Sequence, residues 1–261
     1  MKIAYLLLTG ILSIAMLSPA LGTECTAKSG ERRVALLELY TSEGCNSCPP
    51  ADEWVSKLPS TGLTSDRIVP LAFHVDYWNY LGWRDAFSQT NFAERQRQTA
   101  LVNRSGFIYT PQLVLNGRDY RRGLLWDGTS ERIKEINQQK PLADISLTLS
   151  MPAAGQLHVS GEIMVPGALE RQNTQAYLAL YENNLSNDVR AGENNGRTLH
   201  HDFVVRELVG PIAVDQHGNA QFQQTFNFNA RWKLHDSGVV AFVQNSRSGE
   251  VLQALALAAC K

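Results

Sequence analysis

The sequence lacks an excess of charge of either sign. Its 261 residues include 24 Lys and Arg and 25 Asp and Glu, which give a formal net charge of −1. Proteins that bind nucleic acid or anionic lipid present clustered basic residues, so this composition argues against both kinds of partner. Hydrophobic residues make up 44% of the chain, and a chain of this length can bury the core of one large domain or of two ordinary ones.

Beyond its first residues, the sequence also lacks an apolar run long enough to span a membrane. Lys2 precedes an apolar stretch over residues 3–17, and Ala20 and Gly22 then provide the small residues that signal peptidase accepts. This stretch is shorter than the roughly 20 apolar residues that a spanning helix needs. We therefore predict a signal peptide over residues 1–22 and a periplasmic or secreted mature chain without a membrane span. A membrane anchor is the alternative.

Cysteine is scarce, with four residues in the whole chain: Cys25, Cys45, Cys48 and Cys260. In an oxidising compartment an even number of cysteines suggests pairing, and four cysteines allow three connectivities. If the closely spaced Cys45 and Cys48 pair with each other, Cys25 and Cys260 remain, near the two ends of the mature chain. We predict a structural disulfide between these two; the alternative is a pair of free terminal thiols.

The first half of the mature chain alternates strand-like and helix-like stretches. "VALLELY" is an apolar run broken only by Glu38, as in a strand buried on both faces, and Asn116-Gly117 is a strong hairpin-turn signal. The predicted elements are strands at 34–40 and 67–78, helices at 51–58, 85–103 and 129–140, and a hairpin at 111–123. Such alternation indicates an α/β layer structure, which we place at residues 24–141.

The pattern changes near residue 142. From there on, short stretches mostly alternate apolar and polar residues, and turn-like segments rich in Gly, Asn, Asp and Pro separate them. The predicted strands lie at 144–151, 156–165, 175–183, 201–214, 220–230 and 238–258. Six or seven short strands at this spacing indicate an antiparallel β-sandwich, which we place at residues 142–261.

The two closely spaced cysteines stand between the first predicted strand and the first predicted helix, in "LYTSEGCNSCPPADEW". Unpaired N–H groups and the dipole at a helix start favour a thiolate over a thiol. In redox chemistry Cys45 would be the exposed attacking thiol, and Cys48, one turn further in, the resolving thiol. A static disulfide and half of a zinc site are the alternatives. The zinc site is less favoured, because structural zinc usually needs four ligands and no second C-x-x-C exists.

A Thr110-Pro111 step directly precedes the predicted hairpin. A proline at a strand start is unusual unless it serves a special turn, such as one with a cis X-Pro bond. With this step, the order of elements resembles the thioredoxin superfamily: strand, C-x-x-C, helix, strand, helix, Thr-Pro, hairpin, helix. The resemblance implies that Pro111 is cis, lies beside Cys45 and helps to receive an extended substrate chain. An ordinary trans proline is the alternative.

Four blocks narrow the resemblance: "ELYTSEGCNSCPPAD", "PLAFHVDYWNYLGWRDAF", "ERQ" and "YTPQLVLNG". Together they look like a family of exported thioredoxin-like proteins of uncharacterised function, whose members carry a β-rich C-terminal region. The sequence differs from thioredoxin at Gly44, where thioredoxin has tryptophan, and at Asn46-Ser47, where it has Gly-Pro. Glu43, if near the sulfur, would oppose thiolate formation. The reduction potential therefore does not follow from the sequence.

Two ionisable residues are candidates for assisting proton transfer. Glu38 is the only ionisable residue in its strand and, if buried below the cysteines, could transfer the proton of Cys48; a solvated strand-end position is the alternative. His74 and Asp76 point to one face near the carboxyl end of their strand, where ligands collect in α/β sheets. His74 could relay protons to Cys45, or it could pack as a hydrogen-bonded core histidine.

Substrate contact is assigned to Thr110, Asp76 and Trp78. Trp78 belongs to an aromatic cluster, "DYWNYLGW", that could form a hydrophobic rim near the cysteines or pack over a sheet. In the second half, "DVRAGENNGRTLHHDFVVREL" carries polar side chains that could bind a ligand, but no mechanism follows from them. The adjacent His200 and His201 are a weak metal signal, because neighbouring strand residues face opposite ways.

These observations predict thiol–disulfide exchange with protein or peptide thiols and disulfides as partners, and they imply no organic cofactor. Two alternatives stay open. One is a Cu(I)-binding protein that uses Cys45, Cys48 and His74, since soft sulfur ligands select that ion. The other is a non-catalytic binding module with a static disulfide. Neither the direction of electron transfer nor the oligomeric state follows from the sequence.

Overall fold

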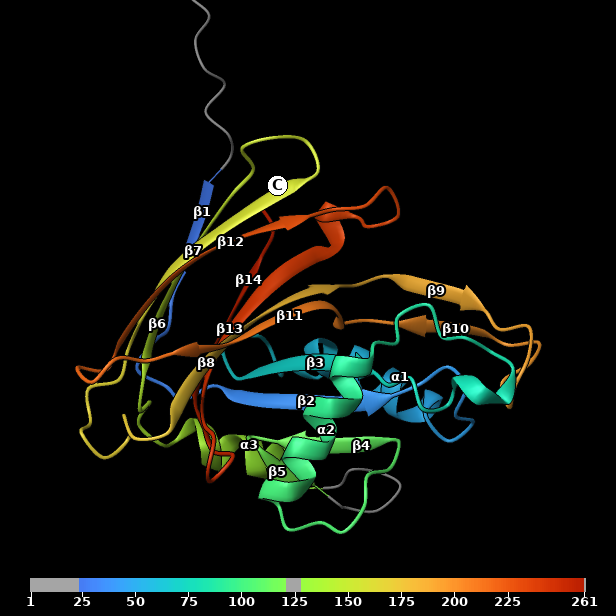
Figure 1. The fold of residues 1–261 in the computed structure, drawn as a ribbon, viewed down its shortest axis with the longest axis horizontal. Helices are drawn as coiled ribbons and strands as arrows, with labels where there is room; N and C mark the ends of the chain where they lie inside the picture. Colours follow the sequence, from blue (N-terminus) through green and yellow to red (C-terminus); the bar gives the residue numbers. More distant parts are fainter. Residues whose placement is uncertain (1–23, 121–127, 261) are drawn as a thin grey trace, which may run out of the picture.

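A computed structural model describes residues 24–120 and 128–260 of the chain. Within these residues the protein is mixed α/β, with many strands and few helices (Figure 1). The predicted signal peptide and the end of the predicted hairpin, residues 121–123, lie outside the described part. No helix among the described residues is long and apolar enough to cross a membrane.

The larger sheet contains strands from both halves of the chain (Figure 1). Among the described residues it has eight strands, in the order β14 (Val251–Ala258), β13 (Ser237–Asn245), β8 (Thr174–Glu182), β11 (Val204–Ala213), β3 (Ile68–His74), β2 (Ala35–Thr41), β4 (Gln112–Leu115) and β5 (Arg118–Asp119). The parallel strands β2 and β3 are buried along their whole length, as their continuous apolar sequences predict. β11 pairs in parallel with β3 and joins the two halves.

The second sheet is antiparallel and, in the part of the chain described, consists of β1 (Glu24–Lys28), β6 (Asp144–Ser150), β7 (Gln156–Met164) and β12 (Asn219–Asn227). Residues buried alternately along β6 pack with residues of β7, β8, β12 and β13 into one core. This packing gives the second half a sandwich-like arrangement, as its alternating pattern predicts. A short hairpin of β9 (Leu185–Asp188) and β10 (Thr198–His201) extends from one end of the molecule (Figure 1).

The helices cover the two faces of β2. On one face α1 (Pro49–Lys57) and α3 (Thr129–Asn137) pack against the side chains of Leu37 and Leu39. On the other face α2 (Thr90–Val102) packs against Leu36 and Tyr40. Short 3-10 turns lie at η1 (Leu58–Thr61), η2 (Asn79–Leu81) and η3 (Leu234–Asp236). Because strand side chains alternate, odd-numbered residues of β2 face α1 and even-numbered residues face α2.

The predicted boundary near residue 142 does not separate two sheets. β1, from the first half of the chain, pairs with β6 of the second half, and the larger sheet crosses the boundary through β3 and β11. A disulfide joins Cys25 in β1 to Cys260, with Cα atoms 5.7 Å apart, so the predicted structural disulfide between these two cysteines is present.

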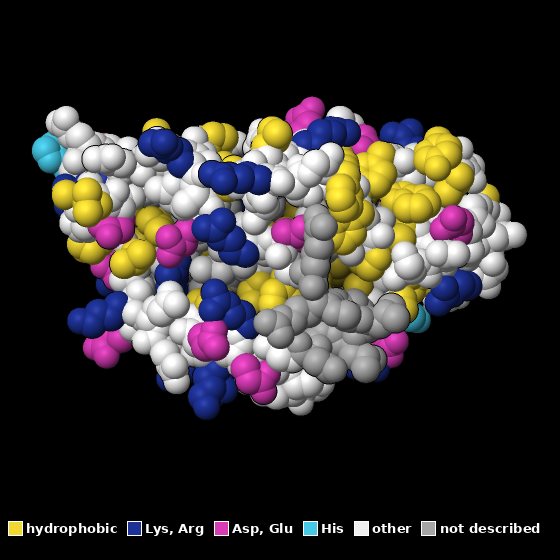
Figure 2. Space-filling model, turned by 90° about the horizontal axis from the view of Figure 1, so that it is seen from below, with side chains coloured by type: hydrophobic (Ala, Val, Ile, Leu, Met, Phe, Trp, Pro, Cys, Tyr) yellow, Lys and Arg dark blue, Asp and Glu magenta, His cyan; other side chains and the backbone are white. Residues whose placement is uncertain are grey.

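On the face drawn in Figure 2, basic and acidic side chains are intermingled, in keeping with the low net charge.

Candidate functional site

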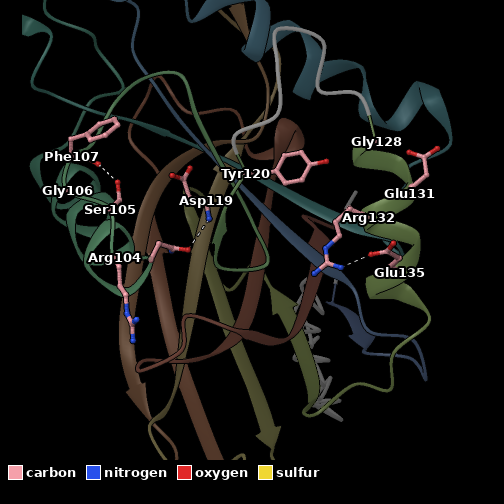
Figure 3. A pocket seen from close by; sticks show the side chains of 11 residues that line it. Arg104, Ser105, Gly106, Phe107, Asp119, Tyr120, Gly128, Glu131, Arg132 and Glu135 are labelled. Atoms are coloured by element: carbon pink, nitrogen blue, oxygen red, sulfur yellow. Dashed lines mark hydrogen bonds and ion pairs between the residues drawn. The ribbon is translucent and has the colours of Figure 1, made fainter.

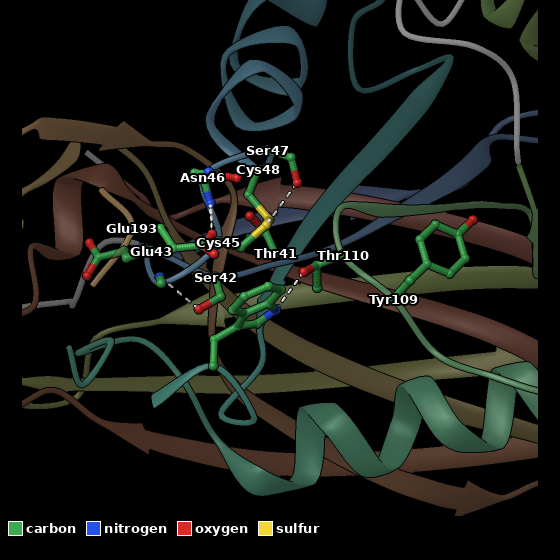
Figure 4. Close-up of a disulfide and its surroundings, with 12 residues drawn as sticks. Thr41, Ser42, Glu43, Cys45, Asn46, Ser47, Cys48, Tyr109, Thr110 and Glu193 are labelled. Atoms are coloured by element: carbon green, nitrogen blue, oxygen red, sulfur yellow. Dashed lines mark hydrogen bonds between the residues drawn. A yellow bond between two sulfur atoms is a disulfide. The ribbon is translucent and has the colours of Figure 1, made fainter. Parts of the chain in front are cut away.

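The C-x-x-C turn connects the end of β2 to the start of α1. A disulfide joins Cys45 to Cys48, whose Cα atoms are 5.5 Å apart, and Cys48 is the N-cap residue of α1 (Figure 4). The backbone N–H of Cys45 donates to the carbonyl of Ser42, and the N–H of Cys48 donates to the carbonyl of Cys45. The helix then starts with two prolines, which fit the first turn because its N–H groups need no partner within the helix.

Both cysteines are fully buried, with 0% of their surface exposed. The expectation that Cys45 is the exposed thiol is therefore wrong for this conformation. Asn46 and Ser47, between the two cysteines, are exposed instead. The hydroxyl oxygen of Ser47 lies 3.3 Å from the Sγ of Cys45 (Figure 4). An external thiolate cannot reach either sulfur unless neighbouring segments move.

The connection between β9 and β10 lies against this turn and holds it by hydrogen bonds. The fully buried Asn194 donates through Nδ2 to the carbonyls of Glu43 and Cys45, at 2.8 and 3.0 Å. The backbone N–H of Asn46 donates to Oε2 of Glu193 at 3.0 Å (Figure 4). These residues come from the polar segment for which the sequence suggested no mechanism. They bind the cysteine turn to a part of the chain about 150 residues away in sequence.

The Thr110–Pro111 peptide bond is cis, as the resemblance implied. The indole Nε1 of Trp78 donates to Oγ1 of Thr110 at 2.7 Å. At the other end of this side chain, a Cβ added to Gly44 would lie 3.0 Å from the Cβ of Trp78. Trp78 therefore connects the C-x-x-C turn with the turn that contains Pro111. Three of the predicted site residues, Trp78, Thr110 and Pro111, thus lie together. Tryptophan before the first cysteine would not fit this arrangement, which explains Gly44.

Two other predicted residues have their side-chain partners outside the cysteine turn. Glu38 belongs to the even-numbered residues of β2, which face α2, and it forms a buried bidentate ion pair with Arg95 at 2.7 and 2.9 Å. The cysteine turn leads into α1 on the opposite face, so this geometry gives Glu38 no route to Cys48. Asp76 accepts a hydrogen bond from the hydroxyl of Thr90 at 2.7 Å. Glu38 is therefore not retained in the candidate site, and the substrate contact of Asp76 stays a prediction.

His74 is fully buried and is held by a carboxylate that the sequence analysis did not identify. Its Nδ1 lies 2.7 Å from Oδ2 of Asp85. Asp85 also accepts hydrogen bonds from the backbone N–H groups of Glu43 and Phe87. Burial alone would raise the pKa of Asp85, but His74 and these N–H groups lower it below its ordinary value. Asp85 therefore accepts from Nδ1 of His74, and Nε2 of the same ring has no hydrogen-bond partner.

A second histidine lies edge-on against His74, with ring centroids 4.8 Å apart. This residue, His201, ends β10, and its nitrogens lie 3.5 Å from Oδ1 of Asp52 and 3.4 Å from Oε1 of Glu43. Neither contact has hydrogen-bond geometry. Burial lowers the pKa of His201, but the two carboxylates outweigh burial and raise it to about 10. Asp52 and Glu43 thus face one imidazole from α1 and from the cysteine turn.

No local sequence pattern indicates this cluster. Asp52 and Asp85 look like ordinary residues at a helix start and in a loop. The alternation rule does separate His201, which is buried, from His200, which is exposed. Alternation along the strand does not predict that β10 ends beside His74, because that contact depends on where the β9–β10 hairpin packs.

A surface pocket of about 940 Å³ opens elsewhere on the protein, beside α3 and β5 (Figure 3). Arg104, Arg132, Asp119 and Glu135 are among its lining residues, so both signs of charge are present. None of the predicted site residues lines it, and we assign it no role.

Comparison with known proteins identifies the family. The chain belongs to the family described as "Protein of unknown function (DUF1223)", whose pattern matches residues 36–244. No curated protein was found to match. The family assignment agrees with the predicted membership of an uncharacterised family, and it supplies no activity.

Two solved structures share the fold over most of the chain. One is a protein of Agrobacterium tumefaciens with 24% sequence identity and a TM-score of 0.62, covering 89% of this chain and 97% of that one. The other is described as HBP35 of Porphyromonas gingivalis, with 15% identity and a TM-score of 0.68, covering 88% of this chain and 76% of that one. At these identities the likeness concerns the fold alone.

Proposed function

We propose that the protein carries out thiol–disulfide exchange through Cys45 and Cys48, with access controlled by the β9–β10 connection. The observation that carries this proposal is a disulfide at the start of α1, linked through Trp78 to a cis Thr110–Pro111 turn. The order β2, C-x-x-C, α1, β3, α2, cis-proline, β4–β5, α3 supports a thioredoxin-like arrangement of residues 24–141. The two disulfides fit an oxidising compartment, as the predicted periplasmic or secreted location requires.

The exchange would run in two balanced steps. The Cys45 thiolate attacks a substrate disulfide, which forms a mixed disulfide and releases one substrate thiolate. The Cys48 thiolate then attacks the Sγ of Cys45, which closes the Cys45–Cys48 disulfide and releases the second substrate thiolate. Two electrons pass from the protein to the substrate, and the reverse sequence oxidises a substrate dithiol. The cis-proline turn would offer backbone groups to an extended substrate chain.

Burial of both sulfurs gives this proposal a specific requirement, because the disulfide must become exposed before it reacts. The hydrogen bonds from Asn194 to Glu43 and Cys45 hold the closed arrangement. Each is worth about 1 kcal/mol net, so losing both should favour opening by about 2 kcal/mol. That free energy corresponds to an open population roughly 30-fold larger.

The test compares the reduction rate of the Cys45–Cys48 disulfide by dithiothreitol in the parent protein and in Asn194→Ala. We expect reduction to be slow in the parent and about 10- to 30-fold faster in the variant. Asn195→Ala is the matched control, because Asn195 is the exposed neighbour in the same connection, and it should leave the rate unchanged. Thiol trapping followed by mass spectrometry distinguishes this pair from Cys25–Cys260.

The complete burial of Cys45 and Cys48 also favours a second candidate function, a binding module with a static disulfide. Equilibration with glutathione separates the two candidates. A midpoint potential well below about −300 mV is typical of structural disulfides. Such a potential, together with equal slow reduction of the parent and Asn194→Ala, would refute the exchange proposal and leave the binding module.

A further inference from the structure

The structure gathers three potential metal ligands beneath the cysteine turn: Asp52 of α1, His74 of β3 and His201 of β10. One ligand atom from each lies within 4.8 Å of the other two. The exposed fractions of the three residues are 6%, 0% and 2%. We propose that Asp52, His74 and His201 bind a divalent first-row transition-metal ion, with zinc as the representative ion.

The first argument comes from polar atoms that lack a partner. Among the described residues, Nε2 of His74 is buried with neither a hydrogen bond nor an ion pair, and the buried ring nitrogens of His201 face carboxylate oxygens at 3.4 and 3.5 Å without hydrogen-bond geometry. Buried polar atoms in folded proteins are nearly always satisfied, and each exception needs an explanation such as an ion that occupies the site. Since Asp85 engages Nδ1 of His74, Nε2 is the ring atom of His74 that remains to bind a metal.

The second argument is that each of the three side chains has a further polar partner at an atom other than its proposed ligand atom. Metal-bound histidines almost always donate their other N–H to a carboxylate or carbonyl. Asp85 lies 2.7 Å from Nδ1 of His74, and Glu43 faces Nε2 of His201 as an ion-pair partner at 3.4 Å, so Nδ1 of His201 is the atom directed to Asp52 and the proposed metal. The second oxygen of Asp52 accepts a hydrogen bond from the hydroxyl of Thr41 at 2.8 Å.

The third argument is the spacing. A tetrahedral zinc ion with bonds of about 2.1 Å separates its ligand atoms by about 3.4 Å. Nδ1 of His201 and Oδ1 of Asp52 are already 3.5 Å apart. Two imidazoles and one carboxylate are borderline and hard ligands that suit zinc or iron(II). Three protein ligands leave one position for water or for another oxygen ligand.

This site differs from the predicted copper site in its ligands. The copper alternative uses both cysteine sulfurs with His74, whereas here the cysteines form a disulfide and His74 faces Asp52 and His201. The zinc proposal therefore does not rest on the proposed exchange function. It predicts that metal binding survives removal of both cysteines.

The test titrates zinc into chelator-treated mature protein and measures stoichiometry and affinity by competition with a chromogenic chelator. We expect one zinc per chain, with affinity reduced at least 100-fold in His201→Ala and about 10- to 100-fold in Asp85→Asn, which keeps the three ligands but removes the carboxylate that contacts Nδ1 of His74. Two controls should bind zinc as the parent does: His200→Ala, the exposed neighbour of His201, and the double variant Cys45→Ser/Cys48→Ser.

Some substitutions of buried residues could prevent folding, so a measurement on the parent protein accompanies them. Zinc-edge X-ray absorption of the parent should show nitrogen and oxygen ligands, including imidazole, and no sulfur. Absence of stoichiometric binding by the parent, or full binding by folded His201→Ala, would overturn the proposal. Sulfur in the absorption spectrum, or loss of binding in the cysteine double variant, would overturn it in favour of a thiolate site.

Discussion

Replacing Arg95 by methionine should destabilise the whole protein, because it leaves a buried carboxylate without its partner. Arg95 is 7% exposed and forms the bidentate ion pair with the fully buried Glu38. Its guanidinium also lies 5.0 Å from the ring centroids of Tyr177 and Phe242 and donates to Gln244. The side chain thus joins α2 and β2 to strands of the second half.

The size of the effect follows from the burial of the pair. Removing one partner of a buried ion pair costs about 3–5 kcal/mol, since the remaining charge stays uncompensated. With a guanidinium m-value of about 5 kcal/mol per M for a chain of this size, the unfolding midpoint should fall by about 0.6–1 M. Circular dichroism and tryptophan fluorescence should report the same shift, because Arg95 contacts both halves.

Arg97→Met is the matched control for this measurement. Arg97 lies on the same helix with its side chain exposed, so the same substitution there should leave the midpoint nearly unchanged. A midpoint shift of less than about 0.2 M for Arg95→Met, or about 1 kcal/mol, would show that the ion pair is not a main support of the shared core. A shift confined to one half of the protein would contradict the argument that Arg95 joins the halves.

Two further predictions concern the chain ends and the cysteine turn. The double variant Cys25→Ser/Cys260→Ser opens a loop with a sequence separation of 235 residues and should lose up to about 5 kcal/mol of unfolding free energy. Equal midpoints for parent and variant in oxidising guanidinium titrations would contradict this. Gly44→Ala places a Cβ 3.0 Å from that of Trp78, so it should cost about 1–3 kcal/mol and shift tryptophan fluorescence as Trp78 moves from Thr110. An unchanged spectrum and midpoint would show that the turn accommodates a methyl group.

Much of the fold could be predicted from local sequence patterns. The continuous apolar run of β2 predicted a strand buried on both faces, and the alternation along β6 predicted a strand with one buried face. The change of pattern at residue 142 did not reveal that β11 pairs with β3 across it. Pairing between distant strands depends on tertiary packing, which single-strand periodicity does not encode.

The candidate site was predicted only where its residues form local patterns. The C-x-x-C spacing and the Thr110-Pro111 step indicated the disulfide and the cis bond, which the structure contains. The burial of Cys45 and the partner of Glu38 could not be predicted, since Asn194 and Arg95 act from distant segments. The sequence of a strand with a single glutamate does not reveal whether a cysteine or an arginine contacts that glutamate in the fold.

The β9–β10 hairpin is common to both proposals, yet its residues allow the two to be tested separately. Asn194 donates to backbone carbonyls of the cysteine turn, whereas His201 faces the carboxylates of Asp52 in α1 and of Glu43 in the turn. Substituting Asn194 should loosen the turn without removing a metal ligand, and substituting His201 removes a ligand without breaking the Asn194 hydrogen bonds. Because α1 carries both Cys48 as its N-cap and Asp52 in its first turn, an ion bound to Asp52 and His201 would tie this helix to the hairpin. Binding free energies are reciprocal between coupled sites. The free energy by which the bound ion stabilises the closed arrangement would therefore equal the free energy by which it opposes exposure of the Cys45–Cys48 disulfide.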